Sequence, residues 1–168
     1  RGNLIHHFYD DHQYSEHRGT LGGSCMAGVP SKVLQLYIQN PEVCGLVILY
    51  DDRGEVVDGK YKSKKIKGRA LLWNLTNGET YMDRIYTNYP ADEELFKKFA
   101  EKNGWWAKKT QNSHTDFTMV RGEETKKTTI KVQLKQWGFD YYPYVDSVPY
   151  YNDNVGTLTN NNEADYTN

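Results

Sequence analysis

Two patterns of apolar positions along the chain predict its main elements. Residues 42–52, EVCGLVILYDD, form an unbroken apolar run between turn residues, which is typical of a central strand buried on both faces. Residues 90–104, PADEELFKKFAEKNG, have acids in the first turn, lysines later and Gly104 at the C-cap, which predicts a helix. The expected buried stripe of this helix is Leu95, Phe96, Phe99 and Ala100.

A second helix is predicted over residues 30–41, PSKVLQLYIQNP, because Ser31 can act as its N-cap and Asn40-Pro41 ends it. Its apolar face is Val33, Leu34, Tyr37 and Ile38.

A hairpin is predicted over residues 66–88, IKGRALLWNLTNGETYMDRIYTN, with a two-residue turn at Asn77-Gly78. In that turn Thr76 faces Glu79, so Trp73 should lie opposite Met82 and Arg69 opposite Tyr86. One face should therefore carry six side chains: Arg69, Leu71, Trp73, Met82, Arg84 and Tyr86. The other face is expected to carry Ala70, Leu72, Asp83 and Ile85. A carboxylate among apolar side chains then needs backbone amides, a cation or a cleft.

The later part of the chain alternates apolar and polar residues. Residues 105–111 are expected to rejoin the sheet. Residues 116–120 and 128–139 read as antiparallel strands separated by the charged turn 121–127. The two prolines of residues 140–151 place that segment at an edge or in a loop.

These elements predict an α+β fold with a single mixed, mostly antiparallel sheet and two principal helices. We expect one domain over residues 1–151 and a polar, Asn-rich, poorly ordered tail over residues 152–168.

Composition narrows the function only slightly. The 168 residues have a formal net charge of -1, which argues against a dedicated nucleic-acid or membrane binder. The 14 tyrosines indicate partly solvated surfaces or a binding face, although β proteins are also simply rich in tyrosine. No apolar run is long enough to span a bilayer, and the start does not resemble a signal peptide. Only two cysteines, Cys25 and Cys44, are present, so a reducing compartment is expected and a cytoplasmic protein is predicted.

Arg69 and Arg84 are the main candidates for binding chemistry, because two guanidiniums on one face repel unless an anion lies between them. They bind a phosphate or carboxylate ligand, or they pair with acids of this chain such as Glu79, Asp92 or Asp146. Both interpretations stay open from the residues alone.

Two other segments offer weaker candidates. The glycines around Ser24 and Cys25 allow close backbone approach to a ligand, and a His-rich segment precedes Cys25, so an activated thiol is an alternative to a buried cysteine. The histidine spacing matches no zinc motif, and no metal site is predicted. Lysines of residues 59–69 and 126–135, with the aromatic residues of 137–144, match the components of single-strand nucleic-acid binding or simply a solvated strand face.

Four short motifs resemble an uncharacterised protein family encoded by tailed bacteriophages. They are SCM (24–26), GRALLW (68–73), MDRIYT (82–87) and YPYVDS (142–147). The resemblance implies a phage protein in the host cytoplasm and brings no established activity with it.

The order of helix, strand, hairpin and helix is also similar to the middle of the acetyl-CoA-dependent acetyltransferase superfamily. That resemblance implies an acetyltransferase-like core. However, no glycine-rich loop follows Tyr86, and acids occupy the helix start where the cofactor phosphates would lie, so acetyl-CoA is disfavoured there.

We therefore expect a phage accessory protein that binds an anionic ligand, either nucleic acid or a phosphate-bearing small molecule, without turnover. The predicted ligand site consists of Arg69, Arg84, Tyr86, Ser24, Tyr144 and Asp146. One alternative is an acyl- or nucleotidyl-transferase with Asp83 as base or Cys25 as nucleophile. Another is an inhibitor of a host protein that acts by contact through the aromatic segment 137–151.

Overall fold

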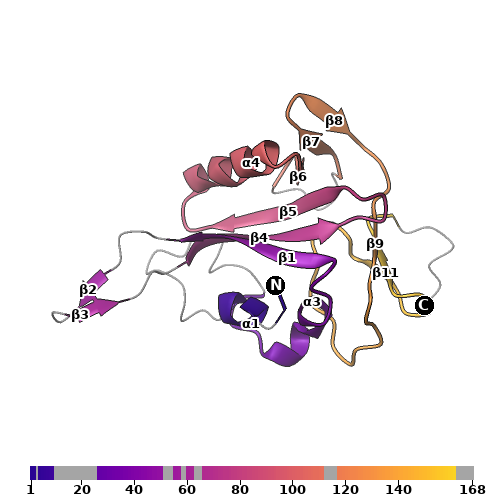
Figure 1. The fold of residues 1–168 in the computed structure, drawn as a ribbon, viewed down its shortest axis with the longest axis horizontal. Coiled ribbons are helices and arrows are strands. Elements are labelled where there is room, and N and C mark those ends of the chain that lie inside the picture. Colours follow the sequence, from indigo (N-terminus) through magenta and orange to yellow (C-terminus); the bar gives the residue numbers. More distant parts are fainter. Residues whose placement is uncertain are drawn as a thin grey trace.

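The computed structural model describes residues 1–2, 4–9, 26–50, 55–57, 60–62, 66–111 and 117–161. Its centre is a six-stranded sheet in the order β1-β4-β5-β6-β7-β8 (Figure 1). The strands are β1 (Cys44–Tyr50), β4 (Ile66–Asn74), β5 (Thr80–Thr87), β6 (Trp106–Lys108), β7 (Met119–Arg121) and β8 (Glu124–Lys126). All neighbours are antiparallel except β5 and β6, which are parallel and joined through α4 (Glu93–Lys102).

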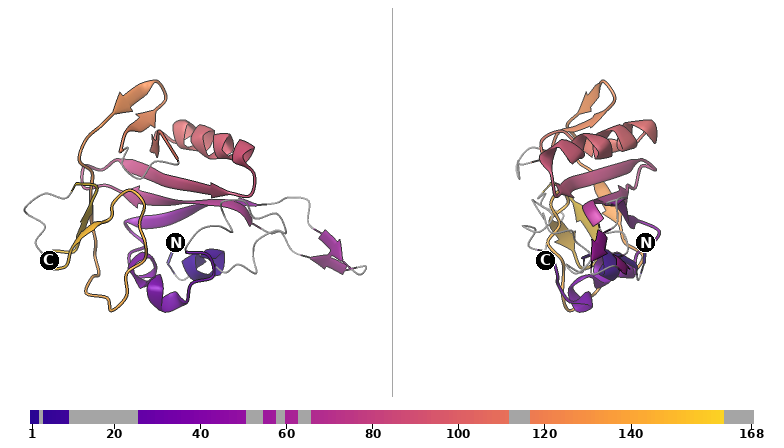
Figure 2. Two further views of the ribbon diagram at one scale, coloured as in Figure 1. Left: turned by 180° about the vertical axis from the view of Figure 1, so that it is seen from behind. Right: turned by 90° about the vertical axis from the view of Figure 1, so that its left-hand side faces the viewer.

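The other elements surround this sheet. A three-stranded sheet has the order β10-β11-β9, and β2 pairs with β3 in a hairpin that stands away from the main sheet (Figure 2). These strands are β2 (Glu55–Val57), β3 (Lys60–Lys62), β9 (Lys131–Gln133), β10 (Tyr150–Asn152) and β11 (Thr157–Thr159). The remaining helices are α1 (Leu4–Tyr9), α3 (Gln35–Ile38) and the 3-10 turns η2 (Ser31–Val33) and η3 (Pro90–Asp92). The α+β class and the mostly antiparallel mixed sheet are confirmed, but the chain forms more than a single sheet.

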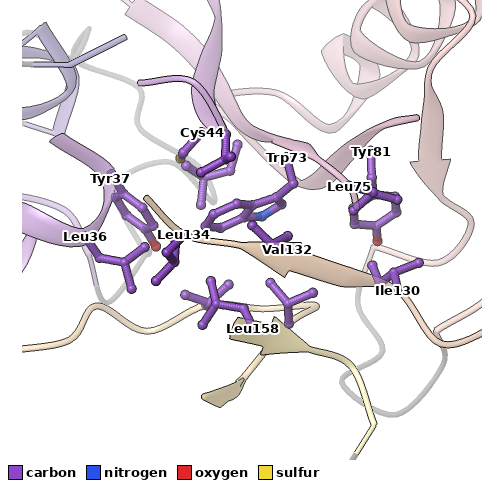
Figure 3. Packing of buried hydrophobic residues seen from close by; sticks show 14 of the residues in the cluster. Leu36, Tyr37, Cys44, Trp73, Leu75, Tyr81, Ile130, Val132, Leu134 and Leu158 are labelled. Atoms are coloured by element: carbon purple, nitrogen blue, oxygen red, sulfur yellow. The ribbon is translucent and has the colours of Figure 1, made fainter. Parts of the chain in front are cut away.

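Apolar side chains pack on both faces of the main sheet. On one face, α4 covers a cluster formed by Ala70, Leu72, Met82, Ile85, Phe96, Ala100 and Ala107. On the other face, α1, α3 and the three-stranded sheet enclose a larger cluster around Trp73 (Figures 1 and 3). Close packing under α4 needs Gly68, because a Cβ atom there would lie 2.8 Å from the ring of Phe96.

The helix predicted over 90–104 is present, and Gly104 follows its C-cap with a φ of 71°. Its stripe was only half right. Phe96 and Ala100 are buried, but the side chains of Leu95 and Phe99 remain 50% and 45% exposed. The predicted helix over 30–41 is broken into η2 and α3, and Ser31 makes no side-chain capping bond.

Three strand predictions were wrong in their placement. The apolar run at β1 lies at the edge of the sheet instead of its centre, since a run of apolar residues does not reveal how many neighbours a strand has. The strand within residues 128–139 is β9, which joins the three-stranded sheet, and the predicted turn 121–127 contains β8.

The predicted tail also differs from the structure over residues 152–161. The expected boundary at residue 151 falls inside β10, and β11 is a buried central strand that pairs with both β10 and β9. Leu158 contributes to the large core cluster (Figure 3), which a composition-based prediction of disorder does not capture.

Candidate functional site: a buried arginine–aspartate cluster

The β4–β5 hairpin brings Arg69, Asp83 and Arg84 together, but the pairing of its strands differs from the predicted pairing. Its loop has three residues instead of two, because Leu75 donates its N–H to the Glu79 carbonyl at 2.8 Å and Gly78 adopts a φ of 86°. Near the loop, Trp73 therefore faces Tyr81 instead of Met82.

A β-bulge then restores the expected register. Ala70 pairs with Ile85 and Leu72 with Met82, so Leu71 faces both Asp83 and Arg84. Beyond the bulge Arg69 pairs with Tyr86, as predicted. Two predicted positions were wrong as a result: Met82 packs on the face covered by α4, and Asp83 lies on the same face as the arginines.

The cluster encloses a small cavity of about 10 Å³, which is room for about one water molecule. Its wall is formed by Tyr9, Met26, Arg69, Leu71, Asp83, Arg84, Tyr86, Tyr144 and Asp146. The side chains come from α1, the segment before η2, β4, β5 and the segment that precedes β10. The site thus joins residues far apart in the sequence.

Arg69 is held inside the cluster, with only 2% of its surface exposed. Its guanidinium carbon lies 4.1 Å from the ring centre of Tyr9 and 5.0 Å from that of Tyr86. Aromatic rings attract a cation electrostatically, and the attraction is stronger where water is excluded. The two tyrosines therefore help to hold this buried charge.

Arg84 and Tyr86 converge on a single carboxylate. Tyr86 donates its hydroxyl hydrogen to Oδ2 of Asp146 at 2.7 Å, and Nη1 of Arg84 lies 3.7 Å from Oδ1 of the same residue. Burial is the main cause that raises the pKa of Tyr86 above its usual value of 10.0, and Asp146 raises it further. Tyr86 is therefore a hydrogen-bond donor at neutral pH.

Asp83 accepts hydrogen bonds at both oxygens. Trp73 Nε1 and the Ser147 N–H donate to Oδ2 at 3.4 and 3.3 Å, while the Arg84 N–H donates to Oδ1 at 2.7 Å. The Ser147 hydroxyl also donates to Oδ1 and accepts from the Tyr81 hydroxyl at 3.0 Å. Burial raises the pKa of Asp83 above 3.8, and the nearby Asp146 acts in the same direction, while the hydrogen bonds oppose the rise. The sequence analysis expected the Asp83 carboxyl to need hydrogen-bond donors, and Trp73, Arg84 and Ser147 supply them.

The segment 144–148 closes the site like a strap. Val145 and Val148 are buried in the main core, and the Tyr144 carbonyl accepts a hydrogen bond from the Tyr37 hydroxyl at 3.3 Å. Between these anchors, Asp146 and Ser147 reach the hairpin. The strap therefore positions the acid that faces Arg84.

Most of the predicted ligand residues meet here. Arg69, Arg84, Tyr86, Tyr144 and Asp146 line the same cavity, whereas Ser24 and Cys25 lie outside the described residues. The sequence interpretation that arginines pair with chain acids is confirmed for Arg84 and Asp146. Of the other two proposed partners, Glu79 pairs with Arg121 and Asp92 with Lys67.

Three participants were missed by sequence reasoning. Tyr9 stacks on Arg69, and Trp73 and Ser147 donate to Asp83. The expectation that Asp83 needs donors pointed to such partners, but nothing in the local sequence identified a serine 64 positions away.

Other candidate chemistry finds little support. Cys44 is buried as predicted, and burial raises the pKa of its thiol. Within the described ranges, no group of three His, Cys, Asp or Glu side chains is placed to hold a metal ion. His12 and His17 lie outside those ranges. No helix in the described part of the chain is long and apolar enough to cross a membrane.

Comparison with protein-family models, with curated proteins and with solved structures found no match to this chain.

Proposed function

We propose that this protein binds an anionic ligand at Arg84 and Tyr86 without turning it over. The observation that carries the proposal is the convergence of a guanidinium and a buried hydroxyl on one carboxylate, that of Asp146. Guanidinium and hydroxyl donors are those that proteins use to bind carboxylate and phosphate groups. In the structure, the Asp146 carboxylate occupies this anion position.

The ligand competes with Asp146 for the site. Two arginines and two aspartates leave the cluster with no net formal charge, and the cavity is too small for a phosphate beside Asp146. Oδ1 of Asp146 accepts no hydrogen bond in the described structure, and its ion pair with Arg84 is long at 3.7 Å. Because the Arg84 side chain is 21% exposed, an anion can approach it from solvent as Asp146 withdraws.

Binding is favoured over catalysis because Asp83 is fully engaged. Each of its oxygens accepts two hydrogen bonds, so Asp83 is not a ready general base. The transferase alternative, with Asp83 as base, therefore has less support than the binding function.

The ligand class follows the guanidinium donors, and the source follows the resemblance of the sequence to a phage family. We propose a phage accessory protein of the host cytoplasm, with nucleic acid or a phosphate-bearing small molecule as ligand. The parallel β5–α4–β6 unit supports an acetyltransferase-like core. Asp92, Glu93 and Glu94 at the start of α4 would repel cofactor phosphates, so the proposed ligand binds at Arg84 instead.

Isothermal titration with inorganic phosphate, a short single-stranded oligonucleotide and acetyl-CoA tests this function. We expect at least one of the first two to bind, Arg84→Ala to abolish binding, and Asp146→Asn to tighten it about tenfold by removing the competing charge, a change of about 1.4 kcal/mol. Arg121→Ala is the matched control, because this arginine is also partly exposed and pairs with two acids, Glu79 and Glu124. Equal losses in Arg84→Ala and Arg121→Ala, or no binding by either wild type or Asp146→Asn, would contradict the proposal.

A second candidate function is inhibition of a host protein by direct contact. The observation that favours it is the group of exposed aromatic side chains between residues 137 and 150, namely Trp137, Tyr141, Tyr142, Tyr144 and Tyr150. Tyrosine and tryptophan are enriched at the energetic centres of protein interfaces. Capture of a specific bacterial protein that is lost in Tyr141→Ala/Tyr150→Ala and retained in Arg84→Ala would support this candidate over the first.

A further inference from the structure

The outer edge of β1 presents backbone groups that no described strand uses. The Val43 carbonyl accepts the Asn74 N–H at 2.9 Å, which fixes the alternation of the β1–β4 ladder. Gly45, Val47 and Leu49 consequently direct their backbone groups toward β4, and Leu46 and Ile48 direct theirs away. Within the described residues, the outward N–H and C=O groups of Leu46 and Ile48 have no hydrogen-bond partner.

Within the described residues, this edge carries few of the features that usually prevent strands from pairing with another chain, and a charged side chain, that of Arg1, reaches it only at its start, where it donates to the Cys44 carbonyl at 3.4 Å. Natural edge strands are commonly protected by lysine, proline or a covering element. The seven residues of β1, CGLVILY, contain no charge and no proline, and the irregularity between Leu49 and Tyr50 lies only at its end. The edge between Gly45 and Leu49 is thus ready to pair.

An apolar groove runs beside the same edge. Val47 and Leu49 pack toward α4, and with Leu95, Phe96 and Phe99 of that helix they line a groove of about 150 Å³. This is smaller than the roughly 300–1,000 Å³ of small-molecule pockets, and it suits one or two apolar side chains. The half-exposed Leu95 and Phe99 form its outer wall.

Two lysines of α4 lie beside the outer wall of the groove. At 100° per residue, Lys98 and Lys102 follow Leu95 and Phe99 around the surface of α4, on the side away from the buried Phe96. Neither lysine forms an ion pair with a described residue, whereas Lys97, on the opposite side, pairs with Glu94 at 3.7 Å. The groove therefore combines an open strand edge, apolar walls and positive charge.

We propose that β1 binds an extended segment of a partner polypeptide as an added strand, with an apolar residue in the groove and acidic residues beside it. Strand addition gains affinity from backbone hydrogen bonds and specificity from alternate side chains. Here Leu46 and Ile48 supply the backbone groups, and Lys98 and Lys102 select acidic neighbours. A second copy of β1 is a poorer occupant, because its seven residues include no acid to meet these lysines.

A synthetic peptide with the length of β1 tests the proposal. Its sequence is valine-glutamate-valine-leucine-valine-glutamate-valine, which puts leucine between two glutamates on one face of a strand. The first measurement is amide exchange by NMR, in which binding should slow exchange at Leu46 and Ile48, because the inward amides of Val47 and Leu49 are already bonded to β4. The second is affinity, measured by fluorescence anisotropy of the labelled peptide.

Variants of the peptide and of the protein sharpen the affinity measurement. Methylating the peptide amides along the edge that faces β1 should abolish binding, and methylating the opposite edge should not. Replacing glutamate by lysine in the peptide, or Lys98→Glu/Lys102→Glu in the protein, should weaken binding about tenfold, equivalent to about 1.4 kcal/mol. Lys127→Glu/Lys135→Glu, which makes the same charge change on exposed residues elsewhere, should leave affinity unchanged.

The outcomes separate this site from the anion site and from self-association. Arg84→Ala should bind the peptide as the wild type does, so failure of the anion site leaves this proposal standing. The strand-addition proposal is overturned if about 1 mM peptide, the weak end of specific binding, gives no exchange protection. It is also overturned if the acidic and basic peptides bind with equal affinity. Protection of Leu46 and Ile48 that appears with rising protein concentration alone would assign the edge to a second copy and overturn the partner assignment.

Discussion

The two faces of the β4–β5 hairpin achieve burial in opposite ways. On the face toward α4, apolar side chains pack around Gly68, where the ring of Phe96 leaves no room for a Cβ atom. On the other face, two arginines and two aspartates are buried or half-buried through hydrogen bonds, aromatic contacts and an ion pair. The bulge at Asp83-Arg84 makes this difference, because it turns both charged side chains to the same face. The polar face depends on particular partners, whereas the apolar face depends on shape.

Removing the carboxyl of Asp83 tests the polar face and should cause the largest loss of stability. Asp83→Ala leaves the donors of Trp73 and Ser147 without their acceptor in a buried site and removes a negative charge beside the arginines. Taking one member from a buried charged network typically destabilises a protein by about 3–5 kcal/mol. We expect a loss of that size at neutral pH, measured by urea unfolding.

The matched control is Asp140→Ala, since Asp140 is exposed and should tolerate the change with little loss. A loss of under about 1 kcal/mol in Asp83→Ala, within the range of ordinary surface substitutions and minor defects, would show that the polar face contributes little to specifying the fold.

Adding a methyl group at Gly68 tests the close packing of the apolar face and should cause a smaller loss of stability. In Gly68→Ala the new Cβ would lie 2.8 Å from Phe96 and 3.1 Å from the Thr87 methyl, and the buried Phe96 ring has little freedom to move. Overpacking of this kind destabilises by about 1–3 kcal/mol. The measurement is again urea unfolding.

Gly45→Ala serves as its control, because the nearest atoms to the new Cβ belong to the exposed and flexible Arg1 side chain, at 3.2 Å. If both alanines were equally tolerated, α4 would be seated loosely enough to shift, and close packing would not distinguish this face.

The individual helices and strands of this fold could be predicted from the sequence, but the pairing and packing of these elements could not. Helix α4 has acids, lysines and Gly104 in positions that depend only on the helix itself, so it was found with nearly correct bounds. The strand β1 was found but placed centrally, because its apolar run is equally suited to an edge strand with one face packed toward α4. The pairing of β11 with β9 depends on contacts some 26 positions apart, which no local pattern encodes.

The candidate site shows the same division. The pairing of Arg69 with Tyr86 was predicted correctly, because the three-residue loop and the bulge shift the register in opposite directions and cancel at that pair. Between the loop and the bulge only the shift from the loop applies, so Met82 and Asp83 were assigned to the wrong faces of the hairpin. A bulge has no strong sequence signature. However, an aspartate in an apolar row was a signal that the regular alternation fails there.

The pH dependence of stability should give the smallest effect and the most direct test of what holds Asp83. Burial raises its pKa above 3.8 in the folded protein. Between 3.8 and the raised value, the folded protein keeps a proton that the unfolded chain has released. The contribution of Asp83 to stability is therefore fully present at lower pH and declines as pH rises through the folded pKa, by at most about 1.4 kcal/mol per pH unit.

Asp83→Asn cannot ionise, so the free energy of unfolding of the wild type minus that of Asp83→Asn should fall with rising pH. Urea unfolding from about pH 4 to pH 7, across the range where a raised carboxyl titrates, measures this difference, and Asp140→Asn gives the profile of an exposed aspartate. A difference that instead grows with pH would mean that the guanidiniums and hydrogen bonds outweigh burial. The polar face would then be stabilised by the ionised Asp83 carboxylate and its partners, and burial would not be the dominant influence on this residue.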